Sequence, residues 1–508
     1  MMIALVNVYN RVVKEDVSLE QLYTSLRDKV AAEIFSINCA EFDIESIGVV
    51  FKDYKYLCFN IGLETVEFVF KLIRKLKNIH VKLKILIVGT FATITADKLI
   101  LECSEIDYIV LGDYEEPVKQ YIIEGKISEA FYSLGEDISK KSPYVINMKN
   151  YCVVDHVLLN ENSLRKLPIS SIETARGCIG KCYFCTQNCM LNRKRIPWRG
   201  RNIRDVFTEI INTYEKYGIV VFHITDSALE IPGKLGKQRI DELCDMLLAY
   251  RQKFSFHFNT RVNGFSLEDE RLLEKMRRAG FLRALVGIES FDDQDLCFYN
   301  KQTSVENNMQ TLRLLQDKGF YIDCGFIFLN PLSSFSSVKN NYMMSKKYNL
   351  FYDYHFHTRL CVYYGSDTYY ELKEMGLLKE GYKYMNTLEY KFLDPKIEKI
   401  SDRLNLAGKL ASYQKQEMNY ISFTRNYISI MNVLDRAASE EYQLNIEPYI
   451  AKMCDLKFEM FGDILFSEDS IQKIMEEYNQ KIMAIYASIF GVIQKAIKNK
   501  KYLTYMRR

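Results

Sequence analysis

The feature that most constrains this 508-residue chain is a short loop with three cysteines, Cys178, Cys182 and Cys185. Their spacing is C-x3-C-x2-C, and an aromatic residue, Phe184, precedes the third cysteine. Three thiolates on so short a loop can bind three irons of a four-iron cluster and leave the fourth iron without a protein ligand. A catalytic metal site needs such an open position, whereas a structural site avoids it. The loop therefore predicts a [4Fe-4S] cluster with one reactive iron.

Three other uses of these cysteines compete with the cluster. A structural zinc site needs a fourth ligand; Cys189 lies four residues after Cys185 and could serve, although the loop contains no histidine. A disulfide framework is unusual in a long chain without a secretory signal. Unligated thiols prefer apolar packing to a glycine-rich turn. The spacing favours the cluster over all three.

Composition excludes several broad classes of function. Hydrophobic residues make up 48% and charged residues 26% of the chain, as in ordinary soluble globular proteins. The net charge of +3 gives no electrostatic reason to expect nucleic acid as a partner. The thirteen cysteines have no regular spacing outside the loop, and no uncharged apolar run reaches transmembrane length. We therefore expect a cytoplasmic enzyme that binds neither nucleic acid nor a membrane.

The hydrophobic pattern predicts an α/β chain in four parts: an α/β domain (1–125), a linker (126–170), a barrel domain (171–385) and a helical domain (386–508). In the first domain, alternation predicts an open, mostly parallel sheet whose ligand lies beyond the carboxyl ends of the strands. Its predicted strands are 3–8, 47–51, 56–60, 84–88 and 108–111, and its predicted helices are 19–35, 63–76 and 96–102.

The central domain repeats a strand and a helix four times, which predicts a partial (βα) barrel with its active site at the carboxyl ends of the strands. The predicted helices are 203–217, 236–251, 267–279 and 305–318, and the predicted strands are 219–224, 254–260, 283–287 and 321–328. The final domain reads as helices, most clearly over 471–497, and we expect it to cover the barrel mouth or one flank.

The cysteine loop resembles the signature of the radical S-adenosylmethionine (SAM) superfamily, C-x3-C-x-aromatic-C. The resemblance implies that Cys178, Cys182 and Cys185 are the catalytic cluster ligands and that Phe184 is the motif's aromatic residue. It also implies that the amino and carboxylate groups of SAM chelate the open iron. An electron from the cluster then cleaves SAM to a 5′-deoxyadenosyl radical, and the protein supplies position and exclusion of water.

Polar residues at the predicted strand ends extend this resemblance. The segment 287–290 looks like the superfamily's Gly-Ile-Glu-Ser motif, which implies that Glu289 binds the SAM ribose. The same resemblance places Asp226 near the SAM amino group, Arg261 at its carboxylate and Ile327 at its adenine. Asp226 also has a plain alternative as a helix cap.

The first domain resembles the cobalamin-binding domain that precedes many radical SAM domains. The resemblance implies that Gly89, Thr90, Gly112 and Glu115 contact cobalamin. The second glycine of each motif is missing, and no Asp-x-His-x-x-Gly sequence supplies a lower cobalt ligand.

Two alternatives for this domain stay open. It can be a degenerate domain that only recognises substrate. It can also be a methylthiotransferase-type domain using Cys39, Cys58 and Cys103, although the residues around these cysteines match that family poorly.

A histidine pair after the barrel strands gives the candidate substrate residues. His355 and His357 alternate with aromatic residues and are followed by Arg359, so they lie on one face of a strand. Core packing is the plain alternative for both histidines.

The resemblance as a whole implies a cobalamin-dependent methyltransferase acting on an unactivated carbon of a natural product or peptide, with flavodoxin or ferredoxin as electron donor. The alternatives are a non-methylating radical SAM cyclase, cross-linking or rearrangement enzyme, and a non-catalytic iron–sulfur protein.

Overall fold

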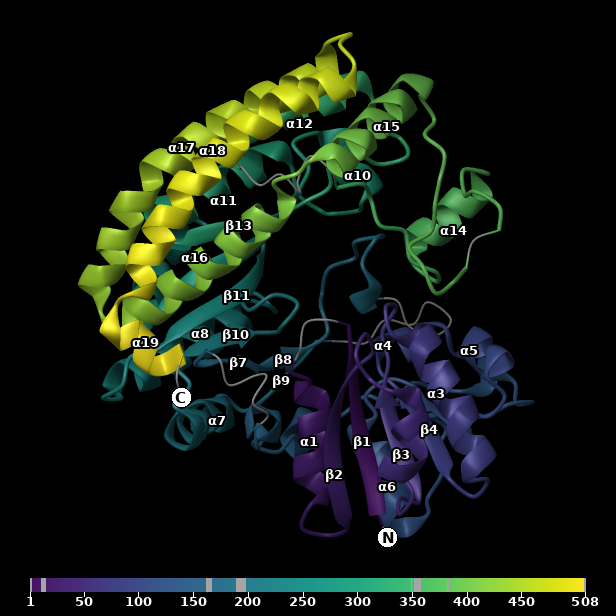
Figure 1. Cartoon of the computed structure of the whole chain (residues 1–508). Helices are drawn as coiled ribbons and strands as arrows, with labels where there is room; N and C mark the ends of the chain where they lie inside the picture. Colours follow the sequence, from purple (N-terminus) through teal and green to yellow (C-terminus); the bar gives the residue numbers. More distant parts are fainter. Residues whose placement is uncertain are drawn as a thin grey trace.

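The computed structural model describes residues 2–10, 15–160, 167–188, 198–348, 350, 358–381 and 383–506. It contains two parallel sheets and a set of long C-terminal helices (Figure 1). The N-terminal sheet and its helices form one lobe, and the central sheet is flanked by the long helices on the other side of the view. The α/β fold class expected from the sequence is confirmed, including its helical C-terminal part.

The N-terminal sheet has six strands in the order β2-β1-β3-β4-β5-β6, and only β6 is antiparallel to its neighbour. Helices α1 and α6 cover one face, and α3, α4 and α5 cover the other. The strands are β1 (Met2–Tyr9), β2 (Ala31–Asn38), β3 (Tyr56–Asn60), β4 (Lys84–Val88), β5 (Tyr108–Val110) and β6 (Phe131–Tyr132). The helices are α1 (Val17–Leu26), α2 (Ile47–Val50), α3 (Val66–Ile79), α4 (Thr90–Ile94), α5 (Ala96–Glu102) and α6 (Glu115–Glu124).

Two predicted elements of this domain were wrong. The predicted helix over 19–35 ends at Leu26, and β2 begins at Ala31 and pairs with β1 over eight residues. β2 is an edge strand that is only partly buried, so its apolar residues do not stand out as a separate run. The predicted strand over 47–51 is α2, a single helical turn whose Val49 is 73% exposed. Apolar runs this short do not distinguish strand from helix.

The central sheet has five strands, all parallel, in the order β13-β12-β11-β10-β7. The predicted βα repeat is confirmed, with boundaries within a few residues of the prediction. The strands are β7 (Ile169–Ile172), β10 (Val221–Ile224), β11 (Ser255–Arg261), β12 (Phe281–Glu289) and β13 (Tyr321–Phe326). The helices are α7 (Ile203–Tyr217), α8 (Lys234–Ala249), α9 (Glu270–Ala279), α10 (Asp293–Phe298), α11 (Val305–Asp317) and α12 (Phe335–Lys347), and a small sheet pairs β8 (Ala175–Arg176) with β9 (Arg199–Gly200).

The C-terminal part is helical, and α18 has the bounds expected from the sequence. α16, α17 and α18 pack on one another, and their buried residues join the core of the central sheet. The helices are α14 (Asp367–Glu374), α15 (Pro395–Leu410), α16 (Gln414–Leu434), α17 (Arg436–Phe466), α18 (Ile471–Ile497) and α19 (Lys500–Met506). In the part of the chain that the structure describes, every helix is too short or too polar to cross a membrane.

Candidate functional site

The cysteine loop follows β7 and β8 and is held in place by contacts from distant segments. The backbone N–H of Tyr183 donates to Tyr299 O at 3.0 Å, and Thr368 N donates to Tyr183 O at 3.2 Å. The side-chain amide of Asn300 donates to Lys181 O at 2.8 Å. The loop conformation is therefore fixed by the α10 region and the start of α14 as well as by the loop itself.

The sulfur atoms of the loop lie in a partly buried, polar setting. The backbone N–H of Gly180 donates to Cys178 Sγ at 3.3 Å, the kind of contact that tunes an iron–sulfur cluster. Burial raises the pKa of the Cys182 and Cys185 thiols, and the positive charges of Lys301 and Arg261 oppose this rise at Cys182.

The spacing of the three sulfurs bears on the zinc alternative. A tetrahedral zinc site with bonds of about 2.3 Å places its sulfurs about 3.8 Å apart. In the described residues, one group of His, Cys, Asp and Glu brings three ligand atoms within 4.8 Å of one another, and it is Glu15, Glu20 and His156. The three cysteines of the loop do not belong to this group. Cys189 lies outside the described residues.

Glu289 lies at the carboxyl end of β12, beside the cysteine loop. Its backbone has a φ of 65°, in the left-handed region that residues with a side chain rarely adopt. The residue is 8% exposed, and its carboxylate accepts a hydrogen bond from Lys301 Nζ at 2.6 Å. Lys301 Nζ also lies 6.0 Å from the centre of the Phe184 ring. Strain and a buried ion pair thus meet where the sequence predicts a SAM contact.

Lys301 is the residue of this group for which the sequence predicted no specific role. It is 6% exposed, and a Cβ on Gly287 would lie 2.6 Å from its Nζ. A buried lysine is rare without a partner, and Glu289 is that partner. The sequence signal is weak, because twelve residues and one helix separate the two charges.

Arg261 ends β11 and lies against the cysteine loop. Its guanidinium donates to Asn263 Oδ1 at 3.2 Å and to Lys301 O at 3.4 Å. A Cβ added to Gly180 would lie 2.0 Å from Arg261 Nη1, so this guanidinium packs directly against the backbone of the loop. Ile327 is half-buried beside the same site, and its N–H donates to Glu289 O at 2.7 Å.

Asp226 follows the end of β10, but its carboxylate is occupied by the chain itself. It is 3% exposed and accepts from Thr174 N at 2.7 Å, from Ala175 N at 3.0 Å and from the Thr174 hydroxyl. Burial raises the pKa of Asp226 to about 6. The side chain fastens the segment that leads into the cysteine loop, and its expected contact with SAM stays a prediction.

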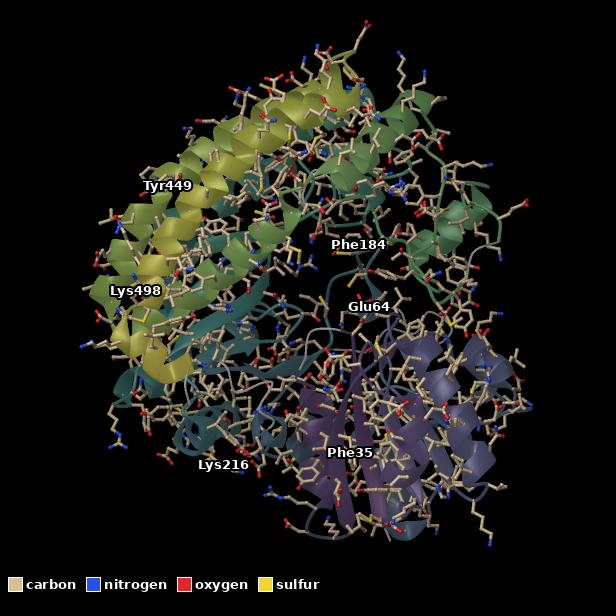
Figure 2. The ribbon with its side chains drawn as sticks, viewed as in Figure 1. Phe35, Glu64, Phe184, Lys216, Tyr449 and Lys498 are labelled. Carbon is tan, nitrogen blue, oxygen red and sulfur yellow. The ribbon has the colours of Figure 1, made fainter. Side chains whose placement is uncertain are left out.

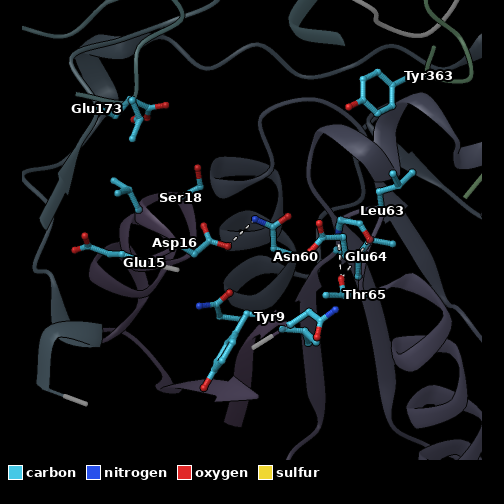
Figure 3. A pocket seen from close by; sticks show the side chains of 17 residues that line it. Tyr9, Glu15, Asp16, Ser18, Asn60, Leu63, Glu64, Thr65, Glu173 and Tyr363 are labelled. Atoms are coloured by element: carbon cyan, nitrogen blue, oxygen red, sulfur yellow. Dashed lines mark hydrogen bonds between the residues drawn. The ribbon is translucent and has the colours of Figure 1, made fainter. Parts of the chain in front are cut away.

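A cavity of about 560 Å³ lies at the carboxyl ends of β1 and β3 (Figure 3). In the strand order, β2 lies on one side of β1 and β3 on the other, so this crevice is the topological switch point where ligands of open α/β sheets bind. Asn60 Nδ2 donates to Asp16 Oδ2 at 2.6 Å across it. Glu173 and Thr225, from the central domain, complete its wall.

A second cavity, of about 320 Å³, lies between α4 and the cysteine loop. Thr90 and Ile94 contribute from α4, and Thr186 and Gln187 contribute from just after Cys185. Leu63 and Tyr363 line both cavities, so the two adjoin. Figure 2 labels Glu64, on the first cavity, and Phe184, in the loop, where the two lobes meet.

Thr90 alone of the expected cobalamin residues lines one of these two cavities. Gly89 and Gly112 have φ angles of 105° and 83°, and side chains there would clash with Asn60 and with the backbone of Tyr144. Contacts within the chain therefore already require both glycines. Any contact with a cofactor stays a prediction for them.

Glu115 connects the two lobes instead of facing a cavity. It is 1% exposed and accepts from Arg176 Nη2 at 2.5 Å. Arg176 also donates to Asp113 at 3.0 Å and to Glu173 at 2.8 Å. Arg176, which lies two positions before Cys178, is thus anchored to the end of the N-terminal sheet.

Of the three expected substrate residues, the structure describes Arg359 alone. His355 and His357 lie outside the described residues. Arg359 donates to Glu389 at 2.7 Å and lies 5.4 Å from the centre of the Tyr390 ring. Its role as a substrate contact stays a prediction.

A buried network that the sequence did not reveal joins the linker to both lobes. His156 Nδ1 lies 2.7 Å from Glu15 Oε1, and His156 Nε2 lies 3.3 Å from Glu209 Oε1. Glu20 Oε2 lies 3.5 Å from the same ring, and Arg201 pairs with Glu209 at 2.6 Å. These residues are far apart in sequence, and no motif marks them.

Comparisons with known proteins agree with this geometry. Residues 172–332 match the profile of the radical SAM superfamily. The chain is 29% identical over 178 residues to an anaerobic magnesium-protoporphyrin IX monomethyl ester cyclase of Rubrivivax gelatinosus, a match covering 34% of this chain and 30% of that protein.

Two solved structures share the fold. The cobalamin-dependent SAM radical enzyme OxsB, with aqua-cobalamin and SAM bound, has a TM-score of 0.71 at 15% identity, over 98% of this chain and 80% of its own. The radical SAM methyltransferase TsrM of Kitasatospora setae has a TM-score of 0.54 at 15% identity, over 68% of this chain and 70% of its own.

The superfamily profile begins at the last residue of β7 and spans the other four strands of the central sheet and all three cysteines of the loop. Members of this superfamily use a [4Fe-4S] cluster and SAM. The chain therefore contains a radical SAM domain over residues 172–332.

Proposed function

We propose that this protein is a cobalamin-dependent radical SAM methyltransferase that acts on an unactivated carbon of a natural product or peptide. The observation that carries the proposal is the pair of adjoining cavities between the two lobes. They reach from the switch point of the N-terminal sheet to the cysteine loop. Two cofactors can therefore meet there, one from each lobe.

In this proposal Cys178, Cys182 and Cys185 hold the [4Fe-4S] cluster, which with SAM supplies the 5′-deoxyadenosyl radical. The hydrogen bond that the N–H of Gly180 donates to Cys178 Sγ supports this assignment. Glu289, paired with Lys301, accepts hydrogen bonds from the SAM ribose. Arg261 pairs with the SAM carboxylate from its place against the loop.

Cobalamin, which supplies a methyl group when bound, fits the cavity at the switch point. The cavity is open and its lining is mostly polar, including Asn7, Asp16, Asn60 and Thr65, as an amide-rich cofactor requires. Thr90 lies beside it in the adjoining cavity. In the described residues, no histidine lines either cavity.

The experiment is anaerobic reconstitution with iron, sulfide and hydroxocobalamin, followed by desalting and an absorption spectrum. We expect about one retained cobalamin per chain beside the cluster. Gly62 lines the cavity, and a Cβ added to it would meet no atom within 4 Å, so Gly62→Phe projects a ring into the space without a clash at its base. This variant should keep the cluster and lose cobalamin.

Gly491→Phe is the matched control, because Gly491 is equally uncrowded but lies on α18, far from the cavity in sequence and absent from its lining. Equal retention by the wild type and both variants would place cobalamin elsewhere. No retention by the wild type would remove cobalamin from the proposal.

The second candidate is a non-methylating radical SAM cyclase, cross-linking or rearrangement enzyme. The similarity to a cyclase over 178 residues favours it. Product mass separates the two functions, since methyl transfer adds one methylene unit and cyclisation does not.

A further inference from the structure

The central sheet has one covered face and one open face. Side chains alternate between the two faces along each strand. On each strand one set of side chains is buried under the helices. In the alternate set His223, His257, Asn259, Leu285 and Gly287 keep part of their exposure, whereas Arg283 is buried. Leu285 is 43% exposed although β12 has a neighbouring strand on each side. An exposed leucine in an inner strand shows that the helices do not cover this face. The open-face residues include Ser171, His223, His257, Asn259, Arg283, Leu285 and Gly287.

A row of polar side chains crosses this open face. His223 is in register with His257, and His257 is in register with Arg283. The two imidazole rings stack with centres 4.5 Å apart. Arg283 Nη1 donates to both oxygens of Asp323 at 3.1 Å. The row therefore continues across four adjacent strands, from β10 to β13.

Helix α16 packs against this row of side chains. Arg425 Nη2 donates to Asp323 Oδ1 at 2.7 Å, and the hydroxyl of Ser429 lies 2.6 Å from His257 Nε2. The Arg425 side chain keeps 31% of its accessible surface. We call the side chains of His223, His257, Arg283, Asp323 and Arg425 the floor of the open face. The floor thus combines side chains from the sheet and from the C-terminal domain.

Two arginines bring positive charge to the floor. Asp323 is the carboxylate shared by both guanidiniums, Arg283 and Arg425. His223 Nε2 is buried without a hydrogen-bond partner among the described residues. Burial lowers the pKa of His223, with Arg283 and Arg425 adding to the effect and Glu15 opposing it from the N-terminal lobe. The pKa of His257 falls for the same reasons, burial first and then His223, Arg283 and Arg425.

We propose that this floor binds an anionic group of the substrate, a carboxylate or a phosphate. Arginines and histidines donate to such oxygens, and the unpaired His223 Nε2 offers one more polar contact. From Arg283 to Glu289 the strand spans about 20 Å, which is room for SAM above and a substrate below. An anion held at the floor orients the rest of the substrate toward the cysteine loop. The inference rests on the proposed radical SAM chemistry and names the substrate class.

The first test measures the melting temperature of the cluster-loaded enzyme with inorganic phosphate or acetate, against chloride at equal ionic strength. We expect at least one anion to raise the Tm of the wild type, since a ligand of the native state stabilises it. Phosphate alone would indicate a phosphate ester, acetate alone a carboxylate, and both an anion of either kind. Arg283→Met should abolish the shift.

Arg271→Met is the matched control, because Arg271 is exposed on α9 and is not one of the open-face residues. It should keep the full shift. Equal shifts in all three proteins, or no shift in the wild type, would overturn the proposal and leave Arg283, Asp323 and Arg425 as a structural link between α16 and the sheet.

A second measurement does not depend on whether Arg283→Met folds. Diethyl pyrocarbonate modifies neutral histidines, and peptide mass spectrometry locates the adducts. In the wild type, the effective anion should slow modification of His223 and His257 by a factor of about 1 + [L]/Kd. His80, on the far side of the N-terminal lobe, should react at the same rate with and without the anion. Unchanged rates at His223 and His257 would contradict the proposal, whatever the outcome of the cobalamin experiment.

Discussion

The two parallel sheets of this protein use their faces in opposite ways. The N-terminal sheet is buried on both faces, so that Leu86 and Ile87, neighbours on β4, enter two different cores. The central sheet is buried on one face and open on the other, where Leu285 is 43% exposed. The first sheet can therefore hold a ligand only beyond its strand ends, whereas the second can also hold one against its face. This difference suits the roles that we propose, with cobalamin at the strand ends of the first sheet and the substrate on the open face of the second.

The largest effect on activity should come from a substitution in the cysteine loop. Cys178→Ala should reduce 5′-deoxyadenosine formation to the assay background, because a cluster with two protein ligands does not retain its iron in place. Iron content and SAM cleavage, measured anaerobically with dithionite, check this. Cys297→Ala is the control, since Cys297 is an exposed thiol on α10 and should leave both values unchanged. Normal SAM cleavage in the Cys178 variant would remove the loop from the chemistry.

The next effect should separate SAM binding from cluster binding. Glu289→Gln keeps the shape of the side chain but loses the charge that Lys301 pairs with. A hydrogen bond to a charged group is worth about 1.5–3 kcal/mol, so SAM should bind about 10- to 100-fold more weakly. Equilibrium dialysis with labelled SAM measures this, and the iron content should match the wild type. An unchanged affinity would show that Glu289 does not touch SAM.

The contrast between the buried faces of the first sheet and the open face of the second predicts that leucine-to-alanine substitutions will destabilise the protein by different amounts. Leu86→Ala removes a side chain that is 0% exposed and should cost about 2–5 kcal/mol of unfolding free energy. Leu285→Ala should cost less than about 1 kcal/mol, because this side chain has little packing to lose. Chemical denaturation of the two variants provides the values. Similar losses would mean that the open face is packed after all.

The smallest effect should be a change in the pH dependence of stability, which arises from the buried Glu20 and His156 at the junction of the lobes. Burial, and then the charge of Glu15, raise the pKa of Glu20 to about 8. The folded state therefore holds a proton that the unfolded state releases near pH 4.5, so stability falls as the pH rises toward 8. The pKa of His156 is raised well above 6.5 by its carboxylate partners, which outweigh burial, so its contribution is also lost as the pH rises.

Glu20→Gln should flatten the fall in Tm between about pH 6.5 and 8.5, because one of the two titrations is gone. Glu124→Gln, an exposed substitution on α6, should leave the wild-type slope. A slope in the Glu20 variant as steep as in the wild type would show that Glu20 keeps its proton throughout this range or has already lost it.

The strands and helices of the central domain could be predicted from the sequence, whereas those of the N-terminal domain could be predicted only in part. Strong 3.6-residue periodicity and glycines such as Gly218 and Gly280 at helix ends located the βα units. β2 was missed because it is a half-exposed edge strand. Without β2 the strand order could not be drawn, so the switch point and its lining residues could not be predicted.

Motifs located strand ends but did not show what each side chain contacts. Glu289 and Arg261 do lie beside the cysteine loop. Asp226, Gly112 and Glu115 stand at strand ends too, yet their contacts are with neighbouring backbone or with Arg176. The open-face row of His223, His257 and Arg283 carries no local signature, because its members become neighbours only through strand register.

The Arg176 anchor has a consequence for how the two lobes can be separated, in the laboratory or in evolution. Its guanidinium is tied to Asp113 and Glu115 of the first lobe while its backbone leads directly into the cysteine loop. A protein shortened to begin after residue 125 would bury this arginine beside Glu173 with two of its acidic partners gone. Loss of the first lobe would therefore remove two ion pairs of Arg176, two residues before Cys178, so we expect the conformation of the cysteine loop to depend on the N-terminal domain even without a bound cofactor.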